Sequence, residues 1–333
     1  MPVLSLKTGT KSRSLLVGND AFAPAGTRGL FAGGIATSTG SGNSINVIQY
    51  IDISSTGNST DFGDLSASRY TFAGFGSTTR SVFGGGKNSS GTNQNVIEYV
   101  TTATTGNAVD FGDLLTTNAQ LGGSSNATRG VFFGGYDNSA DVNVIQYVTI
   151  ASAGNATDFG DLVRAEFTKT GCGSPTRAIQ FGGAYNGGGN YSDTITYFTY
   201  ATLGNATSFG TYSSGNRVTP SSASSDTRAL SMGGYTDTGG ATEVNIIDYV
   251  TIATTGNTTD FGDLTVARYE GYGVSTNTRA VAGGGLSFGG GTALRNVMDY
   301  VTIASTGNAT DFGDLLSNTY SLAGASNGHG GLV

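Results

Sequence analysis

The sequence is poor in the residues that most often carry chemistry at active sites. It contains one cysteine, Cys172, one histidine, His329, and no tryptophan. A single cysteine excludes a disulfide framework or a cysteine metal cluster within the chain. A single histidine makes histidine-dependent catalysis and histidine-based zinc sites poor hypotheses. From the sequence we therefore expect no catalytic residues, no metal site and no cofactor.

Charge and long hydrophobic runs are also scarce. Charged residues make up 12% of the chain, about half the usual share, and the net charge is −7. This balance is unfavourable for nucleic acid or an anionic membrane as the main partner. The first residues show no apolar segment of signal-peptide length, and no run is long enough to cross a membrane. We expect a protein without a secretion signal and without membrane insertion.

Glycine and aromatic residues are abundant instead. The 333 residues include 55 Gly, 16 Tyr and 17 Phe, and hydrophobic residues make up 37%. Disordered chains are poor in aromatic residues, so this composition indicates a folded protein. Collagen is excluded because only 4 Pro are present and Gly does not recur at every third position.

A repeat of about fifty residues runs along the chain. The motif Asp61-Phe-Gly-Asp-Leu65 returns four times, and a degenerate copy occupies 208–212. Two further anchors recur with it. One is Thr-Arg, then four residues, then Gly-Gly, and the other is a strand-like Asn-Val-Ile-x-Tyr. The phenylalanines of the six copies are Phe62, Phe111, Phe159, Phe209, Phe261 and Phe312. The tyrosines are Tyr50, Tyr99, Tyr147, Tyr197, Tyr249 and Tyr300. Repeats of this length are typical of propellers and solenoids.

Each repeat reads as four short strands, called A to D. In the second repeat we expect them at 69–76, 80–86, 95–102 and 109–114, because β-branched and aromatic residues fill these segments. No stretch shows sustained helical periodicity. Six such repeats predict an all-β fold, a six-bladed β-propeller with four-stranded blades. We expect the six phenylalanines and the six tyrosines to pack in the core between blades.

The repeats also suggest how the ring closes. Residues 1–26 precede the first anchor and form an N-terminal extension, whereas 27–333 form the propeller. The first repeat lacks a strand A, while 320–325 read as a strand A without strands C and D after it. We therefore expect the C-terminal strand to complete the first blade beside the strand that begins at Arg28, which protects two sheet edges.

The Gly-Gly pair and the later tyrosine, for example Gly85-Gly86 and Tyr99, resemble the repeats of kelch propellers over about 27–325. The chain departs from the kelch pattern because a phenylalanine, always 12 residues after the tyrosine, replaces the kelch tryptophan. The decapeptide at 306–315, Thr-Gly-Asn-Ala-Thr-Asp-Phe-Gly-Asp-Leu, resembles repeats in structural proteins of tailed bacteriophages, particularly marine ones, such as tail-fibre and virion proteins. This resemblance implies a place in the virion and other virion proteins as partners. It also implies contact with a host-surface glycan or protein, and a homo-oligomer in a symmetric particle.

Length variation is concentrated in one loop of the repeat. The spacing from tyrosine to phenylalanine is constant, whereas the spacing from the anchor arginine to the tyrosine ranges from 18 to 22 residues. The B–C loops therefore vary, and in a meander they lie on one face together with the D–A connectors. These loops are rich in Gly, Ser, Asn, Thr and Tyr, which suits adaptable binding, although drift in neutral surface loops is an open alternative. The candidate partner-binding residues are Tyr136, Asp137, Tyr185, Asn186, Tyr191, Tyr235 and Asp237.

The anchor arginines and the motif aspartates are interpreted as structural. We expect each arginine to pair with nearby motif aspartates and to bind turn carbonyls; a ring that binds anionic ligands is the alternative. We expect the aspartates to cap turns, with calcium binding left open. The arginines are Arg28, Arg80, Arg129, Arg177, Arg228 and Arg279. The aspartates are Asp61, Asp64, Asp110, Asp113, Asp158, Asp161, Asp260, Asp263, Asp311 and Asp314.

Two classes of function remain open at this point. The first is a non-enzymatic binding or assembly protein of a virion, in which Lys7, Lys11 and Arg13 of the extension contact an acidic neighbour in the particle. The second is a carbohydrate-active or other hydrolytic propeller that uses paired carboxylates, or a lectin-like propeller. The regular acids belong to the repeat, whereas catalytic residues would break its symmetry. The sequence therefore favours binding, including a purely architectural capsid decoration, over catalysis.

Overall fold

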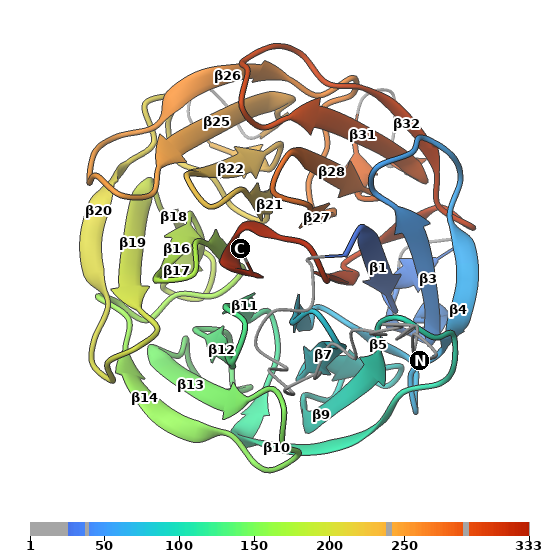
Figure 1. Cartoon of the computed structure of the whole chain (residues 1–333). Helices are drawn as coiled ribbons and strands as arrows, with labels where there is room; N and C mark the ends of the chain where they lie inside the picture. The colour runs from blue at the N-terminus through green and yellow to red at the C-terminus, as the bar shows by residue number, and fades with distance from the viewer. Residues whose placement is uncertain (1–25, 37–39, 238–241, 289–292, 333) are drawn as a thin grey trace, which may run out of the picture.

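Six four-stranded antiparallel sheets stand around a central axis as the blades of a β-propeller (Figure 1). The computed structural model describes residues 26–332 apart from 37–39, 238–241 and 289–292. Strand A lies nearest the axis and strand D at the rim, and the A strands of neighbouring blades contact one another around the ring. The predicted all-β, six-bladed architecture is confirmed.

The first three blades contain the following strands, given in the order A to D. Blade 1 consists of β34 (Ala323–Ser326), β1 (Arg28–Ala32), β3 (Val47–Asp52) and β4 (Thr60–Asp64). Blade 2 consists of β6 (Ala73–Gly76), β7 (Arg80–Gly84), β9 (Gln94–Thr101) and β10 (Val109–Asn118). Blade 3 consists of β11 (Gly122–Ser125), β12 (Arg129–Phe133), β13 (Val144–Thr149) and β14 (Thr157–Asp161).

The other three blades repeat the same order. Blade 4 consists of β15 (Thr170–Gly173), β16 (Arg177–Phe181), β19 (Thr194–Thr199) and β20 (Thr207–Thr211). Blade 5 consists of β21 (Ser221–Ser224), β22 (Arg228–Met232), β25 (Ile246–Thr251) and β26 (Thr259–Asp263). Blade 6 consists of β27 (Tyr272–Ser275), β28 (Arg279–Gly283), β31 (Val297–Thr302) and β32 (Thr310–Asp314). Among the described residues, two short 3₁₀ segments lie outside the blades, η2 (Ser41–Asn43) and η3 (Gly330–Leu332).

The C-terminal strand closes the ring, as the sequence predicts. β34 pairs antiparallel with β1, from Gly29 opposite Ser326 to Ala32 opposite Ala323. The predicted segment 320–325 is shifted, because Thr319–Tyr320 (β33) pairs instead with β2 (Ile35–Ala36) in a separate two-stranded ladder. The chain ends of the propeller are therefore held in one sheet, which leaves blade 1 with the same four strands as its neighbours.

The expected strand A at 69–76 is divided in two. β5 (Arg69–Tyr70) pairs with β8 (Lys87–Asn88) in the B–C loop, and β6 then begins at Ala73. Between them Thr71 has a φ of 53°, a left-handed conformation that ends a strand. Similar small ladders occur in later B–C loops, and the sequence did not predict them. They pair β17 (Ala184–Tyr185) with β18 (Asn190–Tyr191), β23 (Tyr235–Thr236) with β24 (Thr242–Glu243), and β29 (Leu286–Ser287) with β30 (Ala293–Leu294).

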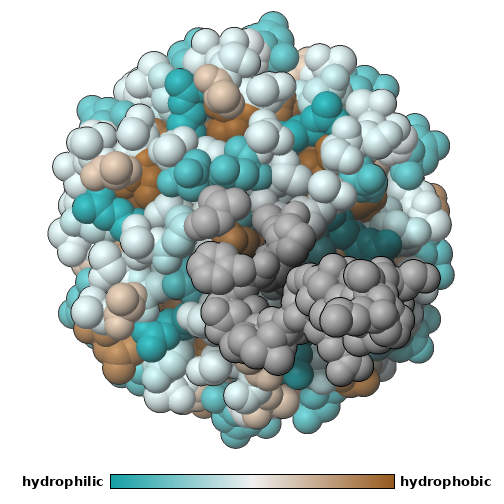
Figure 2. All heavy atoms as spheres, in the orientation of Figure 1, coloured by the Kyte–Doolittle hydropathy of each residue, from teal (hydrophilic) through white to brown (hydrophobic). Residues whose placement is uncertain are grey.

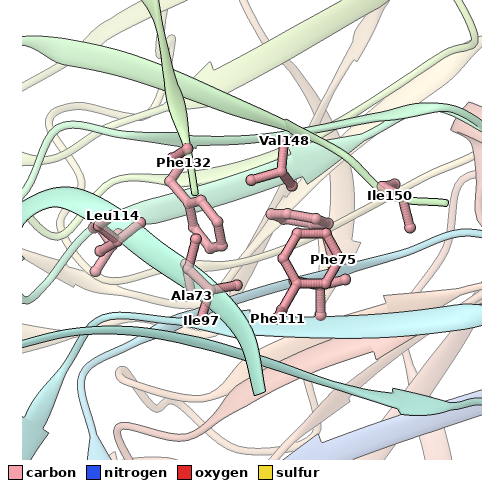
Figure 3. Close-up of a cluster of buried hydrophobic side chains, with 11 residues drawn as sticks. Ala73, Phe75, Ile97, Phe111, Leu114, Phe132, Val148 and Ile150 are labelled. Atoms are coloured by element: carbon pink, nitrogen blue, oxygen red, sulfur yellow. The ribbon is translucent and has the colours of Figure 1, made fainter. Parts of the chain in front are cut away.

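Apolar side chains fill the space between adjacent blades. The motif phenylalanines are each at most 3% exposed, which confirms their predicted place in the core. In the cluster of Figure 3, Phe111 and Leu114 of blade 2 pack with Phe132 and Val148 of blade 3. Each motif phenylalanine also meets the repeat tyrosine of its own blade edge to face, for example Phe111 with Tyr99 at 5.7 Å between ring centroids. The core is thus a ring of six interfaces between blades.

The C–D turn of each blade is bonded to strand D of the preceding blade. In blade 2 the amide of Gly106 donates to Phe62 O at 2.8 Å, and Asn107 Oδ1 accepts from the amide of Asp64 at 3.0 Å. A Cβ on Gly63 would lie 2.5 Å from Gly106 O, so the Gly of Asp-Phe-Gly-Asp permits this close approach. The same contact recurs around the ring and includes Asn58 with Asp314, which joins blade 1 to blade 6. We call these contacts the C–D clasps.

The Gly-Gly pair after strand B allows a second close approach. In blade 3, Gly134 has a φ of 64° and Gly135 a φ of 106°. A Cβ on Gly134 would lie 2.4 Å from Glu166 O, and the amide of Gly135 donates to that same carbonyl at 2.9 Å. The pair therefore lets each D–A connector cross the end of the preceding blade without a steric clash.

The C-terminal segment closes one end of the central channel, and Figure 1 shows it crossing the middle of the ring. His329 Nε2 donates to Gly76 O at 2.9 Å, and its Nδ1 accepts from the amide of Gly331 at 3.1 Å. Behind this segment lies a cavity of about 40 Å³ lined mainly by Gly, Ser and Ala of the A strands. Burial lowers the pKa of His329 to about 4, so the imidazole is neutral at pH 7.

The surface seen in Figure 2 is mostly neutral or hydrophilic, with hydrophobic residues in small separate areas. The part of the chain that the structure describes includes no helix with the length and hydropathy needed to cross a membrane.

Candidate functional site

The D–A connectors and the B–C loops form one face of the propeller, which we call the B–C face. Backbone bridges join each connector to the start of a B–C loop, for example Phe167 to Ala184, Val218 to Tyr235 and Tyr269 to Leu286. The A–B turns are bonded in the same way to the C–D turns, as in Ile150 N to Thr128 O. The predicted division of the turns between two faces is therefore confirmed.

Six connector residues surround the axis in a closed ring of hydrogen bonds. The amide of each residue donates to the carbonyl of its counterpart in the preceding connector, at distances of 2.7–3.3 Å. All six have φ between 50° and 57°, a conformation that is costly for residues other than Gly. The six are Thr71, Gln120, Thr168, Thr219, Glu270 and Ser321. The bonds between connectors hold this strained conformation, and we call the arrangement the axial ring.

Glu270 gives the axial ring its one charged position. The other five positions hold Thr, Gln or Ser, so the carboxylate breaks the symmetry of the repeat. Ser321 Oγ donates a hydrogen bond to Glu270 Oε2. Burial nevertheless raises the pKa of the Glu270 carboxyl above its usual value. Glu270 lines both an axial cavity of about 80 Å³ and a larger neighbouring cavity.

Aromatic side chains line this larger cavity, which measures about 300 Å³ and opens on the B–C face of blades 4–6. Tyr235 lies at its centre, with ring centroids 5.9 Å from Tyr191, 5.4 Å from Tyr269 and 6.3 Å from Phe288. Tyr269 and Phe288 are 5.3 Å apart. Phe167 completes the aromatic lining. We call this the aromatic cavity.

The electrostatic environment of the aromatic cavity is negative. Burial raises the pKa of Tyr269, and the charges of Glu270 and Glu243 add to the rise. Burial also raises the pKa of Tyr191, with a further contribution from Asp237. Glu243 is held close to the cavity because its Oε1 accepts a hydrogen bond from the amide of Phe288 at 2.8 Å. The phenol groups therefore stay protonated among carboxylates.

The structure brings together some of the predicted binding residues and separates others. Tyr191 and Tyr235 meet in the aromatic cavity, and Asp237 lies beside them and accepts a hydrogen bond from Asn216 Nδ2. Tyr136 lies farther along the face, with its ring 6.1 Å from that of Phe167.

The remaining three predicted residues do not line the aromatic cavity. Asp137 Oδ1 accepts from the Ser139 hydroxyl and from the amides of Ala140 and Ser139. These bonds lower the pKa of the carboxyl, so this side chain caps a turn. Tyr185 stacks on the guanidinium of Arg164 at 3.7 Å. Asn186 has a φ of 54° and an exposed side chain.

Sequence reasoning missed Glu270, Tyr269, Phe288 and Phe167. Three of them lie in D–A connectors. Because these connectors are nearly constant in length, loop-length variation does not mark them. Phe288 lies in a variable loop, yet nothing in the sequence indicates that its ring meets Tyr269 of the preceding connector. A comparison of the six connectors would have shown that Glu270 is the single acid at its position.

The expected pairing of anchor arginines with motif aspartates is wrong. Among the described residues, none of the six arginines forms an ion pair with a motif aspartate. Arg28 instead stacks on Tyr50 at 4.5 Å, and its Nη1 donates to Thr102 O of blade 2 at 3.0 Å. The other five arginines repeat this geometry, so their expected binding of turn carbonyls is confirmed. Carbonyls at a turn are closer than the aspartates, which lie on the neighbouring strand D.

The motif aspartates contribute mainly through their backbone. The second aspartate of each complete motif donates its amide to a C–D clasp, as Asp113 does to Asn155 Oδ1 at 3.0 Å. Within the residues that the structure describes, no three metal-binding side chains come together. The expected turn capping by these side chains and the calcium alternative therefore gain no support from the geometry.

Buried ion pairs lie beneath the B–C face, where the sequence did not suggest them. Arg217 of a connector pairs with Asp248 of strand C at 3.0 Å, and Arg268 pairs with Asp299 at 2.8 Å. Arg69 pairs with Glu98 in the same way. These acids occupy the variable position of Asn-Val-Ile-x-Tyr. Each pair joins the arginine of a D–A connector to strand C of the blade that follows this connector, beneath the axial ring.

No family model matches the chain, and no curated protein matches it. The predicted extension, with Lys7, Lys11 and Arg13, lies outside the described residues except for Gly26.

Proposed function

We propose that this chain is a non-enzymatic structural and binding protein of a phage particle, and that its partner surface is the B–C face. The observation that carries the binding role is the aromatic cavity, which opens among the loops that vary in length. A rigid scaffold that presents aromatic and polar loop residues is a common design for recognition sites. The place in a phage particle rests on the resemblance of the repeat to tail-fibre and virion proteins.

The other face supports this division of roles. Its C–D clasps and arginine contacts occupy the turns with bonds that hold neighbouring blades together. The partner, in this proposal, is a host-surface glycan or protein, and the extension at 1–26 contacts other virion proteins. A purely architectural role is the second candidate. The constant geometry of the face formed by the A–B and C–D turns, which we call the clasped face, favours it.

Mass spectrometry of purified particles tests whether the chain is a virion component. Exchanging loops 184–192 and 235–244 for loops of other blades should alter host attachment and leave incorporation unchanged. Deleting residues 2–20 should abolish incorporation while the propeller remains folded. Absence of the chain from particles would refute the virion assignment, and unchanged attachment after the loop exchange would leave the architectural role.

A further inference from the structure

Aromatic side chains from four separate segments line the aromatic cavity. Tyr191 comes from β18, Tyr235 from β23, Tyr269 from a D–A connector and Phe288 from the loop after β29. Phe288 remains 42% exposed although it is a large apolar side chain. The faces of aromatic rings carry negative electrostatic potential and attract cations within about 6 Å.

The charges around the cavity have the same sign as these ring faces. Glu270 is the one charged residue in the described lining. Glu243 lies near enough to raise the pKa of Tyr269, and Asp237 raises that of Tyr191 in the same way. Nearby basic groups are already engaged. Lys169 pairs with Glu166 at 2.6 Å, and Arg295 Nη2 donates to Ser287 at 3.2 Å.

We propose that the aromatic cavity binds an organic ammonium ion, namely a quaternary or otherwise alkylated ammonium group carried by a small ligand. The alkyl groups would contact Tyr235, Tyr269 and Phe288, while Glu270 at the floor supplies the opposite charge. This inference rests on the proposed function in taking the B–C face as the binding surface, and it names the chemical class of the ligand.

A neutral sugar is the competing occupant, because sugars also bind beside aromatic rings. It would require several side-chain hydrogen-bond partners in the lining. Two of the lining hydroxyls, Thr168 Oγ1 and Thr219 Oγ1, already donate to the preceding carbonyls at 2.6 and 2.8 Å. The phenol hydroxyls of Tyr191, Tyr235 and Tyr269 remain as partners for a sugar, but a neutral sugar gains nothing from the surrounding carboxylates, whereas a cation does.

Calorimetric titration of the full chain with choline, its uncharged isostere 3,3-dimethylbutan-1-ol, and glucose tests the inference. Choline should bind, and the isostere should bind at least about 5-fold more weakly, since the two differ in charge and hardly in shape. Phe288→Ala and Glu270→Gln should each weaken choline binding by about 5- to 30-fold.

Matched variants control for general effects. Leu203→Ala removes an exposed apolar side chain, and Asp226→Asn removes one negative charge, both from the opposite face. Choline affinity should stay within about 2-fold in both variants. If Glu270→Gln does not fold, Glu243→Gln replaces it, with thermal unfolding of each variant as the check on folding.

Equal affinity for choline and its isostere would overturn the inference, and so would wild-type affinity in Glu270→Gln. Binding of glucose without binding of choline would overturn it in favour of the neutral sugar. None of these results bears on particle composition or host attachment, so this inference and the proposed function can fail separately.

Discussion

The two faces of the propeller are built from the same repeat, but only one of them keeps the same length and contacts in all six blades. On the clasped face, the spacing from the repeat tyrosine to the motif phenylalanine never changes, and the same C–D clasp is made six times. On the B–C face the loops vary in length, and Glu270 and the aromatic rings of blades 4–6 break the symmetry. Contacts between blades constrain the first face, whereas loop tips on the second are free to diverge without loosening the ring.

Removing the closing strand should have the largest effect. Deletion of residues 316–333 removes β33, β34 and η3 and exposes the inner edge of β1, and unpaired edges promote aggregation. We expect an insoluble or aggregated product by size-exclusion chromatography. Deletion of residues 2–20 is the control and should leave a soluble product that elutes as the full-length chain does. A truncated chain with unchanged solubility and melting temperature would contradict this closure.

Truncation of a motif phenylalanine should cost nearly as much stability. Phe111→Ala empties part of the interface between blades 2 and 3 and should reduce the free energy of unfolding by about 3–5 kcal/mol. Phe312→Ala at the interface of blades 6 and 1 should have a similar effect. Chemical denaturation measures both values. A much smaller loss at Phe312 would show that the closing interface is weaker than the others.

Acid should lower the free energy of unfolding, because protonation of His329 disfavours its buried position at the end of the channel on the clasped face. The pKa of His329 is about 4 in the folded protein and 6.5 when unperturbed, so the unfolded chain binds the extra proton between these values. Stability is therefore retained above pH 6.5 and falls as the pH decreases towards 4, by up to about 3 kcal/mol. His329→Gln should remove this part of the pH dependence in thermal unfolding. An unchanged profile would show that the imidazole is accessible to water.

Removing a single clasp should have a moderate effect. Asn107→Ala deletes the acceptor for the Asp64 amide and should cost about 1 kcal/mol. Asn257→Ala should cost the same, although its partner is Thr211 of the degenerate motif, because the bond goes to a backbone amide. Thermal unfolding compares the two. A clearly smaller loss at Asn257 would indicate that the aspartate side chains contribute to the clasp.

Phe288→Ala should have the smallest effect on stability. The side chain is 42% exposed, so its loss should change the free energy of unfolding by less than about 1 kcal/mol. Denaturation under the conditions used for Phe111→Ala gives the comparison directly. A loss of several kcal/mol would mean that the B–C face is part of the core and is not free to diverge.

Much of the architecture could be predicted from the sequence because it follows from local periodicity. Six copies of the repeat at nearly constant spacing predicted six blades and the burial of Phe62 and its counterparts. The same pattern predicted the C-terminal closing strand and the assignment of variable loops to one face. Each of these features depends on residue types and spacings along the chain, which can be read from the sequence directly. Two residues of the aromatic cavity, Tyr191 and Tyr235, were found by the same reasoning.

The remaining features depend on contacts between blades, which the order of residues does not state. The arginines bind carbonyls of the next blade and not the motif aspartates, because a turn brings those carbonyls closer. The axial ring exists because six connectors converge on one axis, where bonds between them hold residues such as Glu270 in a left-handed conformation. The aromatic cavity forms in the same way, since Tyr269 and Phe288 meet only after the blades have packed. Local pattern therefore determined the propeller, and the packing of its blades decided the site.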